Sequence, residues 1–175
     1  MHSFSKLIER CASFTLNSLR LIEDEAIATL QVSGSTEAVT TLQMINLEKT
    51  VLVVGMFSIF EANLQNTLGC TNGFSEAKAI IEQDNNALLL KRFIDLELAV
   101  NVLKHGKGRS YKAITTVQGQ TIPSRIKKQE AFFHEGDISE IDILIEVNNE
   151  LIQNCLDVIN QTCECISKIR PEIRT

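Results

Sequence analysis

The sequence predicts an all-α protein, an up-and-down four-helix bundle with additional short helices. Apolar residues recur at steps of three and four over long stretches of the 175-residue chain. Two prolines and eight glycines are few enough to leave room for long helices. Aromatic residues are scarce, Trp is absent and Leu and Ile are plentiful, a composition that favours helix-on-helix packing over a β-sandwich.

Two long helices are expected in the first part of the chain. Apolar positions at helical spacing run through residues 2–32, and a Ser-Gly-Ser sequence then ends the pattern. Residues 37–67 predict the second helix, capped by Ser35 or Thr36. Its apolar residues form one stripe of Val53, Phe57, Phe60 and Leu64 and a second of Leu47, Val54 and Leu68. Because apolar residues surround positions 51–60 on nearly every side, we expect this helix in the middle of the bundle.

The helix that follows the next turn carries the most informative polar residues. A short helix over 74–83, capped by Ser75 or Asn72, leads to a cap at Asn86 and a helix over 87–105. Its apolar stripe consists of Leu89, Phe93, Leu96, Val100 and Leu103. Glu97, Asn101 and His105 recur every four residues and form a polar ladder beside that stripe. Gly106 and Gly108 then end the helix.

The pattern weakens after Gly108. Residues 110–116 predict a short helix capped by Ser110, and residues 115–133 fit either a long loop or a loose hairpin. We expect the last helix to begin at Ser139, where Asp142 completes a capping box, and to continue to Arg170. Asn148 lies on the apolar seam of this helix. It could fix the register of helix packing, contact a polar group of a partner, or lie at the edge of the core.

The chain is expected to be one helical domain over residues 1–175, with its core at about 37–170. No signal-peptide pattern opens the sequence, and the longest apolar run, residues 51–60, is too short to cross a bilayer. Five scattered cysteines are typical of free thiols in a reducing compartment. These features predict a cytoplasmic protein without membrane contact. Phosphate-loop, dinucleotide and zinc patterns do not occur, so we expect no cofactor and no metal.

Basic residues gather in one segment of this acidic chain. The net charge is −5, yet residues 104–128 contain no acid and the cations Lys104, Lys107, Arg109, Lys112, Arg125, Lys127 and Lys128. Surfaces usually mix the two signs, so this segment is a candidate anion site. The alternative is that these side chains pair with the acidic helices around them.

His105 is the residue whose position best fits catalysis. The C-terminal dipole of its helix favours the imidazolium, and Asn101, one turn earlier, can orient the ring. Lys104, Lys107 and Arg109 supply anion-binding donors around it. A histidine among fixed cations suits RNA phosphodiester cleavage, with the imidazole as general acid or base and the cations stabilising the phosphorane. The alternative is a capping histidine among ordinary solvated lysines.

This arrangement resembles the HEPN superfamily, small helical proteins of prokaryotic toxin, antiphage and RNA-processing systems. Its members carry an Arg-Asn-x-x-x-His type motif at the end of a late helix, often followed by Gly, and Asn101, His105 and Gly106 match those positions. The segment FSIFEANL, residues 57–64, is similar to the second helix of that group, which implies that Glu61 is a supporting polar group near the motif. The alternative for Glu61 is that it turns to solvent or pairs locally. The resemblance covers roughly residues 40–165 and implies a metal-independent endoribonuclease that pairs two motifs across a dimer cleft.

The motif arginine of that family is missing here. Its position is Val100, and Arg92 lies too far upstream to serve. Either Lys104 or Arg109 replaces the arginine, or this chain binds RNA or a partner without cutting.

Two functional hypotheses follow. The first is a HEPN-like RNA-associated protein of a toxin or defence system, a possible endoribonuclease with His105 as acid/base, Asn101 as its orienter, and phosphate contacts from Lys104, Lys107, Arg109 and Lys112. The second is a non-catalytic helical binding module that docks a protein partner through residues 104–128. Apolar stripes on more than one helix side predict a homodimer. RNA and a cognate antitoxin or other protein are the further candidate partners.

Overall fold

The computed structural model describes residues 4–116, 119–127 and 132–172. This part of the chain is helical and contains no strand. Its helices are α1 (Phe4–Val32), α2 (Thr36–Leu68), α3 (Gly73–Gln83), α4 (Ala87–His105), α5 (Arg109–Thr116) and α6 (Asn149–Ile169). The prediction of an all-α protein is therefore confirmed.

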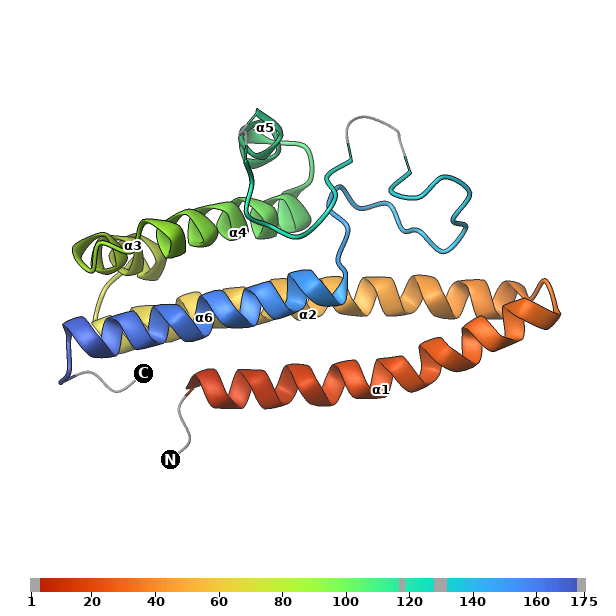
Figure 1. The fold of residues 1–175 in the computed structure, drawn as a ribbon, viewed down its shortest axis with the longest axis horizontal. Helices are drawn as coiled ribbons and strands as arrows, with labels where there is room; N and C mark the ends of the chain where they lie inside the picture. The colour runs from red at the N-terminus through yellow and green to blue at the C-terminus, as the bar shows by residue number, and fades with distance from the viewer. Residues whose placement is uncertain (1–3, 117–118, 128–131, 173–175) are drawn as a thin grey trace.

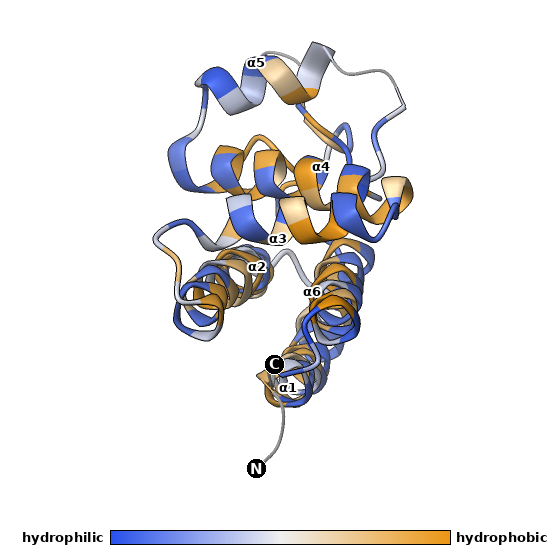
Figure 2. Cartoon of the chain, turned by 90° about the vertical axis from the view of Figure 1, so that its left-hand side faces the viewer, coloured by the Kyte–Doolittle hydropathy of each residue, from blue (hydrophilic) through white to orange (hydrophobic). Residues whose placement is uncertain are grey.

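The helices form layers with α1 and α5 on opposite sides of the molecule (Figures 1 and 2). α1 and α2 form a long antiparallel hairpin, and α6 packs against both. α3 and α4 cover the other side of α2 and α6, and α5 packs on α4. The turn end of the hairpin projects beyond α6, and the irregular segment that precedes α6 lies beside it (Figure 1).

The centre of the core is a group of phenylalanine rings from α2, α3 and α4. Phe57 lies with its ring centroid 4.5 Å from that of Phe74 and 5.6 Å from that of Phe93. The rings of Phe74 and Phe93 meet edge to face at 5.3 Å. The predicted stripe of Val53, Phe57, Phe60 and Leu64 is fully buried, as expected. Ile8 and Ala12 of α1 belong to the same core.

The expected central position of α2 is only partly correct. Leu47, assigned to a second core stripe, is exposed, and so are Val51 and Ile59. One apolar face of α2 therefore has no cover within the described residues. By length and composition, α2 is the one described helix that is apolar enough to span a membrane; this is weak evidence, since core helices of soluble proteins pass the same test.

Most of the predicted helix starts and ends are confirmed by hydrogen bonds. The side chains of Ser35, Asn72 and Asn86 accept from the amides of Ala38, Ser75 and Leu89, so each caps the helix that was expected there. The expected cap at Ser110 is wrong, because α5 already includes Arg109.

The start of α6 was predicted ten residues too early. The helix begins at Asn149, and Asn148 is its N-cap, with Oδ1 accepting from the Leu151 amide at 2.9 Å. Ser139 does not cap a helix: its amide and hydroxyl both donate to Oδ1 of Asp137. Ile145 instead lies in an isolated antiparallel bridge with Ile126, which requires extended backbone.

The structure places α3 very close to α2 at Gly73. A Cβ at this position would lie 2.7 Å from the Glu61 carbonyl oxygen and 2.8 Å from Cβ of Leu64. Only glycine permits this approach without a backbone shift. The contact brings the start of α3 next to Glu61, which is one of the predicted site residues.

The cysteines of α6 belong to the core. Cys155, Cys163 and Cys165 are buried, whereas Cys11 of α1 is exposed. Burial raises the pKa of the Cys155 thiol to about 12. This thiol is therefore protonated at neutral pH and acts as a small apolar side chain.

Candidate nucleic-acid interface

The candidate interface is built on the C-terminal end of α4 and the turn into α5. Gly106 ends α4 with φ of 68° and donates its amide to the Val102 carbonyl at 2.8 Å. This positive φ turns the chain out of α4, and α5 then starts at Arg109. We call the exposed side chains of this region the basic turn: Lys104, His105, Lys107, Arg109 and Lys112.

Every side chain of the basic turn is exposed and has no ion pair or side-chain hydrogen bond to the described residues. Cations elsewhere are mostly engaged: Lys49 pairs with Glu23, Lys78 with Glu97 and Arg170 with Glu76. The acidic helices around the basic turn therefore do not neutralise it. Four positive charges without an ion-pair partner in the described chain and one imidazole are available to a ligand from solution.

The rest of the predicted basic segment behaves differently. Lys127 pairs with Glu140 at 3.1 Å, and Nη1 of Arg125 donates to the Phe133 carbonyl at 2.6 Å. Lys127 and Arg125 therefore bind other groups of the protein. For Lys127 this agrees with the alternative interpretation, in which the basic side chains pair with acidic residues around them. Lys128 lies outside the described residues. The candidate anion site thus shrinks from residues 104–128 to the basic turn.

A small cleft lies next to the basic turn, between α2, α3 and α4. Its volume is about 100 Å³, and its lining residues include Ser58, Glu61, Glu97, Asn101 and Lys104. The structure therefore brings Glu61, Asn101 and Lys104 together. His105, one residue after Lys104, is not among the lining residues. Glu97, the first rung of the polar ladder, pairs with Lys78 at 2.9 Å.

The position of the missing motif arginine is part of the core. Val100 is 3% exposed, and its apolar side chain also lines the cleft, so no positive charge enters the cleft from this position. Arg92 is engaged elsewhere, with Nη2 donating to Oδ1 of Asn154 at 2.7 Å. Of the substitutes considered, Lys104 reaches the cleft, and Arg109 lies across the turn in α5.

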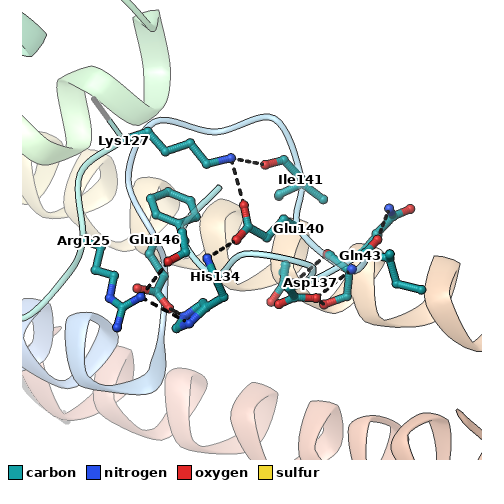
Figure 3. Close-up of polar contacts among 12 residues, drawn as sticks. Gln43, Arg125, Lys127, His134, Asp137, Glu140, Ile141 and Glu146 are labelled. Carbon is teal, nitrogen blue, oxygen red and sulfur yellow. Dashed lines mark hydrogen bonds and ion pairs between the residues drawn. The ribbon is translucent and has the colours of Figure 1, made fainter. Parts of the chain in front are cut away.

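A second polar cluster was not predicted from the sequence (Figure 3). His134 lies between Arg125, at 3.2 Å from its Nδ1, and Glu146, at 2.9 Å from its Nε2. Because a guanidinium can only donate, Nδ1 must accept, and Nε2 carries the proton that it donates to Glu146. Both ring nitrogens are therefore used within the protein. These residues are too far apart in sequence for spacing to have indicated the cluster.

This cluster holds the segment before α6 against α2. The backbone amide of His134 donates to Oε1 of Glu140 at 2.6 Å. In α2, the side-chain amide groups of Gln43 and Asn46 donate to the carbonyls of Ile138 and Ser139. A cavity of about 510 Å³ lies between this segment and the hairpin. Its polar groups mostly bind one another, so we assign the cluster to folding.

Glu140 makes the fold sensitive to acid. Burial raises the pKa of this carboxyl, but hydrogen bonds from the His134 and Phe133 amides and from Lys127 outweigh that effect, and the net pKa lies below its usual value of 4.5. A lowered folded-state pKa stabilises the fold above the unfolded-state pKa, and this stabilisation is lost as the pH falls through the folded-state pKa.

We therefore expect Glu140→Gln to be less stable than the wild type at neutral pH and the difference to shrink below about pH 4. Urea unfolding followed by circular dichroism across this range measures it. Glu135→Gln, which neutralises an exposed carboxylate of the same segment, is the control and should follow the wild type. A constant gap between wild type and Glu140→Gln at all pH values would contradict the assignment.

Among the described residues, no group of three or more His, Cys, Asp or Glu side chains is placed to hold a metal ion. Comparisons of the chain with protein-family models, curated proteins and solved structures gave no match. The residues of the basic turn and the cleft are therefore the features of this chain that point to a function.

Proposed function

We propose that this protein binds RNA through the basic turn and that His105 cleaves the bound phosphodiester without a metal ion. The observation that carries the proposal is the set of uncompensated cations on an otherwise acidic protein. Lys107, Arg109 and Lys112 lie within six residues, all exposed and unpaired within the described chain. Such donors make strong, charge-assisted hydrogen bonds to phosphate groups.

The proposed roles follow from position. His105 is exposed, so its imidazole can transfer a proton to or from a ribose or a leaving oxygen. Asn101 lies one turn earlier on the same face and makes no hydrogen bond to the ring in the described part of the free protein, so its proposed role is to orient the ring once RNA is bound. Lys104 lines the cleft with Asn101 and Glu61, and it replaces the missing arginine as the cation on the developing phosphorane charge.

The helix order is in keeping with a HEPN-like bundle. α1, α2, α4 and α6 alternate in direction along the chain (Figure 1), which is the up-and-down order expected from the sequence. The proposal includes this finer fold assignment, a toxin or defence role and a cytoplasmic location, each of which follows from the resemblance or from the sequence.

Binding is tested with a short unstructured labelled RNA by fluorescence anisotropy at several salt concentrations. We expect Lys107→Gln/Arg109→Gln to bind about tenfold or more weakly. The slope of log affinity against log salt should become shallower by about 0.7 for each phosphate that the variant no longer neutralises. The matched control is Lys6→Gln/Arg20→Gln, which removes two exposed cations of α1 and has the same net charge.

Cleavage is tested with the same RNA in the presence of a chelator. We expect the wild type to cut and His105→Ala to bind but not cut, while His134→Ala, which removes a histidine held in the second cluster, retains activity. Equal cleavage by His105→Ala would remove His105 from the mechanism. An absence of RNA binding by the wild type, or an equal loss in the α1 control, would overturn the proposal.

The second hypothesis is that the same cations dock an acidic protein. Binding of poly-glutamate, compared with binding of RNA, distinguishes this hypothesis from RNA binding. If poly-glutamate binds as tightly as RNA and is equally weakened by Lys107→Gln/Arg109→Gln, the basic turn is a protein-docking surface. If RNA binds far more tightly, the ligand is a polynucleotide.

A further inference from the structure

The exposed face of α1 carries a pattern that is complementary to itself. Arg10, Phe14, Leu21 and Glu25 lie on one side of this helix, and all four are exposed, Phe14 by 76% and Leu21 by 68%. At about 100° per residue they fall within roughly 60° of one another around the axis. Their spacing is symmetric about the point between Asn17 and Ser18, with the charge sign reversed from one end to the other.

An apolar groove lies beside this stripe and shares Phe14 with it. α1 and α2 line a groove of about 490 Å³, to which Ser18, Ile22, Met44 and Leu47 contribute. On α1 the groove extends from Phe14 to Ile22, so its middle coincides with the centre of the symmetric pattern. The exposed apolar side chains of α1 and α2 near this groove and stripe include Leu7, Phe14, Leu21, Ile22, Met44, Leu47 and Val51. Phe14, Ile22, Met44 and Leu47 of this set line the groove together, and an exposed apolar groove is typical of an interaction site.

We propose that this face is a homodimer interface in which two α1 helices pack antiparallel about a two-fold axis near Ser18. A two-fold interface requires that residue i meets residue j and that j meets i. The pattern satisfies this requirement: Phe14 meets the partner's Leu21, and Arg10 meets the partner's Glu25. Each contact occurs twice.

The charges select the direction of the helices. Arg10 and Glu25 have no ion pair within the part of the chain that the structure describes. In the antiparallel arrangement opposite charges meet at both ends, whereas in a parallel arrangement Arg10 would meet the partner's Arg10. Exposed pairs contribute little affinity, so the apolar face supplies the binding energy and the charges supply register and orientation.

The interface has the length that a stable dimer needs. α1 has 29 residues and is about 43 Å long. With the α2 side of the groove added, the face can approach the 1,200–2,000 Å² or so that stable interfaces bury in total. Ser18, whose hydroxyl donates to the Phe14 carbonyl of its own helix, is small enough for close helix contact at the axis.

This dimer leaves the basic turns free. α1 contacts α2 and α6, and it lies on the opposite side of the molecule from α5 (Figure 2). The two basic turns would therefore face outward on the two ends of the assembly. This differs from the pairing of motifs across a cleft that the HEPN resemblance implies, and the inference does not depend on RNA binding.

The test is the mass in solution of the full chain, measured by light scattering after size exclusion. We expect twice the chain mass of 19.5 kDa for the wild type and the single-chain mass for Phe14→Glu. Leu88→Glu, at a similarly exposed apolar site at the start of α4, is the control and should remain dimeric. Circular dichroism checks that each variant is folded.

A charge exchange gives the sharper result. Arg10→Glu alone and Glu25→Arg alone should each weaken the dimer, because like charges then meet at both ends. The double variant Arg10→Glu/Glu25→Arg should restore it. A monomeric wild type, a dimeric Phe14→Glu, or a double variant weaker than both single variants would overturn the proposal. A monomer that co-sediments with phosphatidylcholine vesicles would assign the face to lipid instead and would equally overturn it.

Discussion

Phe57→Ala is expected to lower the free energy of unfolding by about 3–5 kcal/mol. Phe57 is 1% exposed and contacts rings from three other positions, Phe60, Phe74 and Phe93. Its removal leaves a cavity where α2, α3 and α4 meet, and long helices on each side prevent the site from collapsing. Urea unfolding followed by circular dichroism measures the loss.

The matched control is Phe132→Ala, because Phe132 is 63% exposed and the substitution is chemically the same. We expect a change within about 0.5 kcal/mol there. If both variants lost the same free energy, the ring cluster would not be the centre of the core.

Asp95→Ala is expected to cost about 2–4 kcal/mol. The Asp95 carboxylate is buried in α4, and its Oδ2 accepts from both the amide and the hydroxyl of Thr121, each at 2.8 Å. These charge-assisted bonds attach the segment after α5 to α4. Their loss leaves the Thr121 amide without this acceptor, and chemical denaturation measures the cost.

A double-mutant cycle with Thr121→Val isolates the interaction. We expect Asp95→Ala and Thr121→Val to be non-additive by about 1 kcal/mol, since each removes one side of the same hydroxyl bond. Asp95→Asn, which keeps one acceptor oxygen, should lose less than Asp95→Ala. Strict additivity of the two substitutions would show that the carboxylate stabilises the fold by another route.

Features that depend on neighbouring residues in the sequence were predictable. The caps at Ser35, Asn72 and Asn86 each bond an amide three residues onward, and the stop at Gly106 follows from one residue's freedom at positive φ. The buried stripe of α2 around Phe57 follows from helical spacing alone.

Features that depend on distant partners were not predictable. The residues from Ser139 to Asn148 have helical spacing, but Asp137 takes the Ser139 donors, and the backbone of Arg125 and Lys127 pairs with that of Glu146 and Leu144. These contacts hold the segment out of a helix. Periodicity likewise shows that α2 has a second apolar face but not whether another element covers it.

In the candidate site, too, local features were predictable and contacts with distant residues were not. The ladder of Asn101 and His105 was evident from spacing. The difference between Lys107, which is free of ion pairs in the described chain, and Lys127, which binds Glu140, comes from a contact between positions thirteen residues apart and was not evident from charge alone.

The projecting end of the α1–α2 hairpin has a consequence for motion. Around this turn the buried side chains are small ones, Ala26 and Ala38, whereas the opposite end of the hairpin carries the large rings of the core. Local opening costs least where little apolar surface is buried. We therefore expect the tip of the hairpin to unfold and refold locally under native conditions while the half that contains the phenylalanine cluster stays folded.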